Sequence, residues 1–256
     1  MECEIAASLA RRAAAQLAAL RRVIAGTGLL TPAVQATAAA LLADEVPAAW
    51  AGEGSGWADG PESAVAWLRG LAARRAALLR WQARIAGDKG GGAGVEALLS
   101  AGPLRLQDLF RPGTFLNALR QLTARRLIAA GGSGGNSVSM DSLKLVCAWE
   151  RPLLARAPLS IGLEGLLLQG AALDPARSLL TDALLDASET QLTPELFVAW
   201  VAPDFGEPYG KEVTTVAVPL YVADDRERLL ADLLLPCSGD KARWILCGVA
   251  MVLTAS

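Results

Sequence analysis

Histidine is absent from all 256 residues of the chain, and this absence excludes several kinds of chemistry. Without histidine there is no Ser-His-Asp triad, no Cys-His pair, no HExxH zinc site and no ordinary general base for neutral pH. A hydrolase or transferase would need a pocket of pKa-perturbed carboxylates or lysines, and the only lysines are Lys89, Lys144, Lys211 and Lys241. The sequence therefore favours a protein that is not itself an enzyme.

Spacings typical of metal and phosphate sites are also missing. The four cysteines, Cys3, Cys147, Cys237 and Cys247, show no CxxC spacing, and two lie in apolar strand patterns, so we interpret them as buried reduced thiols. Whether Cys237 and Cys247 approach each other depends on a Cα separation that sequence does not give. The glycine runs at 90–94 and 131–135 lack the Gly-Lys-Ser/Thr of a P-loop and indicate linkers. We predict no metal and no cofactor in this protein.

Long apolar runs are missing too, although 53% of the residues are hydrophobic and the mean hydropathy is +0.34. No run reaches the roughly 18 apolar residues that a membrane-spanning helix needs, so we expect a soluble protein with no membrane partner. The net charge is −2, and the arginines of the first half are spread over several helices without aromatic clusters, which does not favour nucleic-acid binding. The carboxylate pairs at 44–45 and 224–225 are interpreted as solvated turn residues.

The first half has the 3.6-residue period of helices separated by breakers. A helix is predicted over 5–25 before Gly26, with an apolar face of Ile5, Leu9, Leu17, Leu20 and Ile24. A second starts at Thr31-Pro32 and ends near 43, and a third opens at 60–63 and places Trp67, Leu71, Leu78 and Ile85 on one face. For Trp50 and Trp57, in a glycine-rich stretch, core packing and an interface role stay equally open.

After 135 the period changes to two, which is typical of strands. Strands are predicted at 143–149, 165–169, 213–221, 229–235 and 244–253, and the segment 174–195 is ambiguous, with room for a short helix. We therefore predict an α+β fold: an N-terminal helical region over 1–130 followed by an antiparallel β-sheet or incomplete β-barrel over 136–256.

The stretch 109–125 is the most informative in the sequence. Pro112 can open a helix, Thr114 can cap it, and Phe115, Leu119 and Leu122 recur at helical spacing. With 141–149, 165–174, 218–221, 235–237 and 244–253, this stretch resembles the C-terminal domain of dynein heavy chains, and is closest to the cytoplasmic class that drives retrograde intraflagellar transport. The signature residues that carry the resemblance are Phe115, Leu116, Arg120, Thr123, Arg125, Asp141, Leu143, Trp149, Gly165, Gly170, Pro219, Tyr221, Arg226, Pro236, Trp244 and Gly248.

The resemblance implies a noncatalytic domain that packs on the ring of six AAA+ modules, braces it and supports minus-end-directed motility on microtubules. ATP is then expected only in the ring. The implied partners are the AAA+ ring of the same heavy chain and, indirectly, dynein intermediate and light chains and the intraflagellar-transport machinery. The implied location is the cytoplasm and cilium, in association with microtubules. After Tyr221 many family members continue with Lys-Thr, whereas this sequence has Val222-Ala223.

No AAA+ core precedes Met1 in this sequence, so a freestanding adaptor with the same fold stays open as an alternative.

Overall fold

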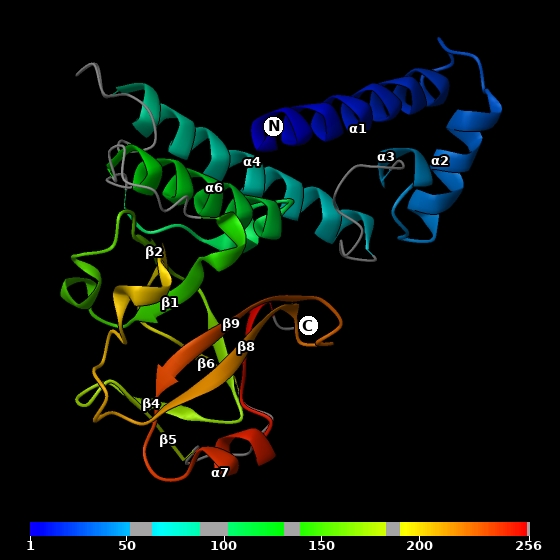
Figure 1. The fold of residues 1–256 in the computed structure, drawn as a ribbon. Helices are drawn as coiled ribbons and strands as arrows, with labels where there is room; N and C mark the ends of the chain where they lie inside the picture. The colour runs from blue at the N-terminus through cyan, green and yellow to red at the C-terminus, as the bar shows by residue number, and fades with distance from the viewer. Residues whose placement is uncertain (52–62, 88–101, 131–138, 183–189, 255–256) are drawn as a thin grey trace. The chain divides into compact units, whose positions relative to one another are not determined.

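The computed structural model describes residues 1–51, 63–87, 102–130, 139–182 and 190–254 (Figure 1). Contacts between residues divide the protein into two compact units. We call residues 1–94 with 108–111 the helical unit, and residues 95–107 with 112–256 the β unit. The boundary predicted at 130–136 marks the change from helices to strands. Contacts instead assign the helix that follows residue 111 to the β unit, so the two divisions rest on different criteria.

Two helices of the helical unit lie where the sequence predicted them: one ends just before Gly26, and the next starts at Pro32. Thr31 accepts a hydrogen bond from the Val34 amide at 3.4 Å, and Pro32 takes the first helical position. The helices are α1 (Glu2–Ile24), α2 (Pro32–Leu42), α3 (Ala48–Ala51) and α4 (Ala64–Gly87). Figure 1 shows α1 crossing α4, and these two helices are in contact.

The core of the helical unit confirms most of the predicted face of α4. Trp67, Leu71 and Leu78 are all buried, whereas the side chain of Ile85 lies outside the described residues. Trp50 is fully buried, and its ring centroid lies 5.4 Å from that of Trp67, so its role is core packing. Trp57 lies outside the described residues.

One position of the predicted α1 face is wrong. Leu9 is buried as expected, but Ile24 is 78% exposed because it occupies the last turn, beyond the part of α1 that packs on its neighbours.

The β unit contains ten strands within the described residues, arranged in three sheets. The sheet orders are β1-β7-β2, β6-β3-β10-β8-β9 and β4-β5. The strands are β1 (Lys144–Ala148), β2 (Ile161–Leu163), β3 (Leu167–Gln169), β4 (Ala172–Asp174), β5 (Leu179–Thr181), β6 (Gln191–Leu192), β7 (Leu196–Val201), β8 (Thr215–Ala223), β9 (Leu229–Pro236) and β10 (Ala250–Thr254). The fold is thus α+β, and the described sheets are rich in antiparallel pairs without closing into a barrel.

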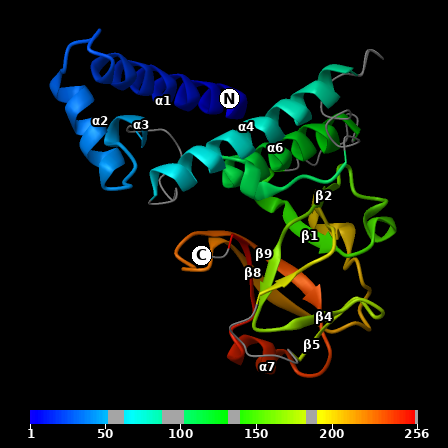
Figure 2. The same cartoon turned by 180° about the vertical axis from the view of Figure 1, so that it is seen from behind.

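One predicted strand needs correction. The predicted strand 244–253 begins as a helix, α7 (Lys241–Leu246), and only then becomes β10, because Asp240 caps a helix by accepting a hydrogen bond from the Ala242 amide at 3.1 Å. The sheet is also not wholly antiparallel, since β10 runs parallel to β8. The described parts of 174–195 hold β5 and β6 and no helix. Both views show α7 next to β5 (Figure 2), where the Ser238 amide donates to the Leu180 carbonyl at 3.1 Å.

The helix of the signature stretch, α6 (Pro112–Ala130), packs on one face of the β1-β7-β2 sheet. It begins at Pro112 as predicted, but Thr114 lies inside the first turn and not at the cap. The buried face is also rotated from the prediction: Leu116, Leu119 and Thr123 are buried, while Phe115 and Leu122 are half-buried. None of the described helices combines the length and apolarity needed to cross a membrane.

Candidate functional site

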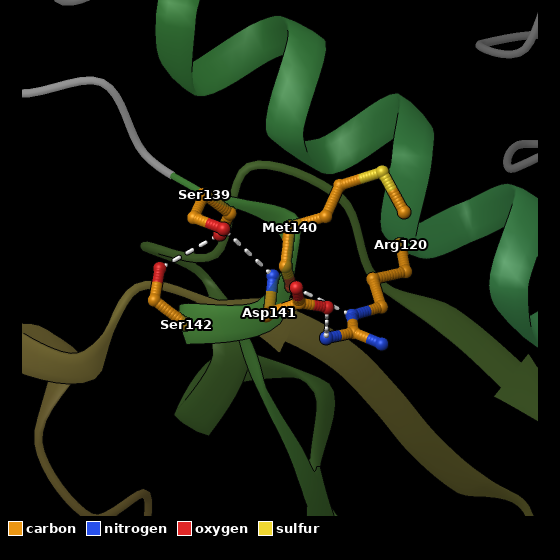
Figure 3. A network of polar contacts seen from close by, with 5 residues as sticks. All are labelled: Arg120, Ser139, Met140, Asp141 and Ser142. Atoms are coloured by element: carbon orange, nitrogen blue, oxygen red, sulfur yellow. Dashed lines mark hydrogen bonds and ion pairs between the residues drawn. The ribbon is translucent and has the colours of Figure 1, made fainter.

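One cluster of signature residues ties α6 to the turn before β1. The Arg120 Nε donates to the Met140 carbonyl at 2.7 Å, and Arg120 Nη2 lies 3.3 Å from Asp141 Oδ1 (Figure 3). The Asp141 side chain is 95% exposed, so this ion pair contributes little, and the carbonyl contact is the stronger link. The turn is closed locally, because Ser139 accepts a hydrogen bond from the Asp141 amide at 3.2 Å. We call Leu116, Arg120, Met140, Asp141 and Trp200 the Arg120 cluster.

Trp200 forms the other side of the Arg120 cluster. The Arg120 guanidinium lies 5.1 Å from the centroid of the Trp200 ring, within range of a cation–π contact. The indole N–H of Trp200 donates to the Leu116 carbonyl at 3.0 Å. A residue on the central strand β7 therefore contacts α6 through both its ring and its N–H, which fixes the helix on the sheet.

A second cluster joins the end of β3 to the start of β10. The Arg226 Nη1 donates to the Gly248 carbonyl at 2.9 Å, and Nη2 donates to Gln169 Oε1 at 3.1 Å. Gly170 and Gly248 have positive φ values of 72° and 63°, which glycine adopts at low cost. Arg226 itself has a φ of 58°, so its backbone is held in a conformation that is uncommon for a side chain of this size. We call Gln169, Gly170, Arg226 and Gly248 the Arg226 cluster.

Trp244 anchors α7 to the rest of the β unit. It is the buried residue of this helix, and its indole N–H donates to the Ser238 carbonyl at 2.9 Å. Pro236 ends β9 just before this loop and is buried. The signature residues 236 and 244 thus shape one loop-helix connection.

The remaining signature residues lie in or beside the same elements without joining either cluster. Trp149 is buried, and its amide donates to the Tyr209 hydroxyl at 2.9 Å. The others are the half-buried Phe115 and the exposed Arg125 on α6, the buried Thr123 and Leu143, Gly165 with a φ of 77°, and the half-buried Pro219 and Tyr221 of β8.

The described residues include cysteine, aspartate and glutamate side chains, the types that could bind a metal ion. No three Cys, Asp or Glu side chains among them come together in a way that could hold a metal ion. Asp44 is exposed and accepts a hydrogen bond from the Ser63 hydroxyl at 2.9 Å, as expected of a turn residue. The polar contacts of both clusters go mainly to backbone carbonyls, and they join segments that are distant in sequence.

The cysteines differ in their surroundings. Cys147 and Cys237 are buried free thiols, whereas Cys247 is free and exposed at the end of α7, contrary to the strand pattern assigned to it. The Cys147 thiol donates to the Leu234 carbonyl at 3.3 Å, and burial raises its pKa from 9.0 to about 12.

We expect this thiol to make the β unit sensitive to alkali. Because the folded pKa of Cys147 lies above its ordinary value, the neutral thiol stabilises the fold below pH 9, and this contribution is lost as the pH rises from 9 towards 12. Thermal unfolding at several pH values should show a falling midpoint in this window. Cys147→Ala should flatten the fall, with the half-buried Tyr209, whose pKa is also raised by desolvation, accounting for part of what remains. An unchanged pH dependence in Cys147→Ala would contradict this expectation.

Two residues important to the clusters were missing from the predicted signature. Trp200 lies on β7, which was not predicted as a strand, although the six apolar residues 196–201 between Pro194 and Pro203 are typical of a central strand buried on both faces. Gln169 lies within the stretch 165–174 of the resemblance, but nothing in the sequence indicates that its amide oxygen accepts from an arginine 57 residues away.

Comparison with known proteins defines the class of protein. Residues 1–253 match the family of C-terminal domains of dynein heavy chains, and the protein belongs to this family. Its relatives include cytoplasmic dynein 2 heavy chain 1 of Homo sapiens, at 40% identity over 237 residues, and that of Chlamydomonas reinhardtii, at 37% over 244 residues. Each alignment takes in 93% of this sequence and 5% of the relative, so the sequence spans about one twentieth of the length of these proteins.

Proposed function

We propose that this protein is the noncatalytic C-terminal domain of an intraflagellar-transport dynein heavy chain, where it braces the AAA+ motor ring and supports minus-end-directed motility. The observation that carries the proposal is the family match over residues 1–253, together with relatives that are dynein 2 heavy chains. ATP binding and hydrolysis are assigned to the ring, and this domain uses no metal or cofactor. Its location is the cytoplasm and cilium, on microtubules.

The two clusters support a bracing role in physical terms. A brace must hold its own shape under load, and this requires contacts between segments that are distant in sequence. Arg120 reaches across 20 residues to Met140, Trp200 across 84 to Leu116, and Arg226 across 57 to Gln169. Such long-range contacts rigidify the β unit, as expected of a part that transmits force without doing chemistry. Dynein intermediate and light chains and the transport machinery are partners of the whole heavy chain in this proposal.

The proposal predicts that the domain supports the motor without supplying its chemistry. We expect a heavy chain without this domain to bind ATP normally, while its ring unfolds at a lower temperature and its gliding velocity on microtubules changes. The measurements are nucleotide binding, thermal unfolding and gliding velocity of matched heavy chains with and without the domain. Loss of nucleotide binding, or identical unfolding and velocity, would contradict the brace.

Membership in a long heavy chain has a direct test. An antibody against residues 109–149 should detect a band far above 26.6 kDa in an immunoblot of the native cells. A band near 26.6 kDa would indicate a freestanding adaptor instead.

A further inference from the structure

The turn between α1 and α2 exposes three large apolar side chains. Leu29 is 87% exposed, Leu30 62% and Ile24 78%. Both views place this turn at the end of the helical unit away from α4 (Figures 1 and 2). Arg21 and Arg22, in the last turn of α1, are exposed beside it. We call Arg21, Arg22, Ile24, Leu29 and Leu30 the α1–α2 knob.

The backbone of the knob is fixed by hydrogen bonds and not loosely looped. Gly26, with a φ of 71°, donates to the Val23 carbonyl at 3.0 Å, and the Thr27 amide donates to the Arg22 carbonyl at 2.9 Å. These two bonds make the glycine-terminated helix end known as a Schellman motif. Four residues later, Thr31 caps α2. Leu29 and Leu30 are therefore held between two defined helix ends.

A fixed turn with exposed leucines fits an interface better than a solvated loop. Loops that face only water are typically polar. Ordering an apolar turn that stays in water gives no favourable free energy, because no apolar surface is buried. In an interface the same order is favourable, because a turn that is already fixed loses less conformational freedom on binding. Apolar side chains beside arginines also match the composition of interface centres, where arginine is enriched and other charges are depleted.

The charge around the knob indicates the chemistry of its partner. Residues 5–43, which include nearly all of α1 and α2, contain Arg11, Arg12, Arg21 and Arg22 and no aspartate or glutamate. Within the residues that the structure describes, the side chains of Arg21 and Arg22 make no ion pair, so their charges are available to a partner. A complementary surface would present a small apolar pocket bordered by carboxylates. The leucines distinguish this partner from a nucleic acid, whose phosphates would need only the arginines.

We propose that the α1–α2 knob inserts into an acid-bordered apolar pocket on the part of the dynein heavy chain that lies outside this sequence. The inference rests on the proposed function and names the surface that this function uses. The outside part is large, since the sequence spans only 5% of the length of its relatives. Leu29 and Leu30 enter the pocket, Ile24 closes one side, and Arg21 and Arg22 pair with the carboxylates.

Amide hydrogen exchange in the intact heavy chain tests the knob directly. In the described residues the amides of Leu29 and Leu30 donate no backbone hydrogen bond, so protection of these amides would report an added partner. We expect both amides to exchange at least about tenfold more slowly than their intrinsic rates, and Leu29→Asp with Leu30→Asp to abolish this protection. The matched control is Leu42→Asp, which alters an equally exposed leucine at the other end of α2 and should leave the protection unchanged.

A second pair of variants tests the charge. Arg21→Glu with Arg22→Glu should also reduce the protection, whereas Arg11→Glu with Arg12→Glu, farther back on the same helix, should have little effect. Unprotected Leu29 and Leu30 amides in the intact heavy chain would overturn the inference. It would also be overturned if the same leucines joined two copies of the protein, or bound lipid vesicles or nucleic acid. If removing the whole domain changes the unfolding temperature and velocity of the motor but the knob variants leave the amide protection unchanged, the proposed docking of the knob is wrong and the bracing function is still supported. If removing the domain has no effect on the motor, the bracing function itself is contradicted.

Discussion

Replacing Trp244 with alanine is expected to destabilise the β unit by about 3–5 kcal/mol, the usual cost of truncating a buried tryptophan. Trp244 is only 1% exposed and is the single buried residue of α7, so it supplies most of the buried apolar contact of this helix, while the partly exposed ion pair of Arg243 with Asp182 contributes little. The indole N–H bond to the Ser238 carbonyl is lost as well. Urea unfolding, followed by amide exchange of β8 and β10, measures the effect in this unit.

The neighbouring residue provides the control. Ile245 is 68% exposed on the same helix, so Ile245→Ala should change the free energy of unfolding by less than about 0.5 kcal/mol. Trp244→Phe should fall between the two, because it keeps an aromatic ring in the core but cannot donate to Ser238. Equal stability of Trp244→Ala and Ile245→Ala would show that α7 does not depend on this anchor.

The elements that sequence predicted well are those whose signals are local. A cap at Thr31 and a proline at position 32 define a helix start within two residues, and Gly26 defines a helix end. The periodic positions Trp67, Leu71 and Leu78 were buried as predicted, because a helix face can be read from spacing alone. In these stretches the tertiary structure agrees with the local preference.

The wrong predictions have two other causes: caps and glycines that interrupt an apolar run, and pairing between segments that are distant in sequence. The run from Trp244 to Leu253 looks like one strand, yet Asp240 caps a helix ahead of it and Gly248, with a φ of 63°, separates that helix from β10. The parallel pairing of β10 with β8 joins residues about 30 apart around β9 and α7, and no local pattern encodes it.

The candidate site shows the same limit. The resemblance supplied Arg120 and Arg226, but their contacts with Trp200 and Gln169 exist only because the strands bring distant segments together. The exposed leucines of the knob were likewise invisible before the structure, since the residue pattern at 29–30 does not tell a buried apolar pair from an exposed one.

Gly170→Ala is expected to lower the free energy of unfolding of the β unit by about 2–5 kcal/mol, because the added Cβ brings both backbone strain and a steric contact. A φ of 72° strains any residue with a Cβ by about 1–2 kcal/mol. The added Cβ would also lie 2.9 Å from the Cys247 carbonyl oxygen and 3.2 Å from the Val249 Cα, both of which are backbone atoms. Backbone must then shift, at a further cost of about 1–3 kcal/mol.

Gly210→Ala is the control that has the backbone strain without the steric contact. Its φ is 77°, and a Cβ there would meet nothing within 4 Å, so Gly210→Ala should show the strain alone, about 1–2 kcal/mol in urea unfolding. If the two alanine variants were equally stable, the close approach of β3 to the α7–β10 connection would contribute nothing.

The shift caused by Gly170→Ala should also reach Arg226, because Gln169 and Gly248, the two acceptors of its guanidinium, flank the contact that would move. A double-mutant cycle with Arg226→Ala should therefore give a combined loss smaller than the sum of the single losses, since the first change already weakens what the second removes. Additive losses would mean that Gly170 and Arg226 act independently, and that the Arg226 cluster is held together by something other than the close packing at Gly170.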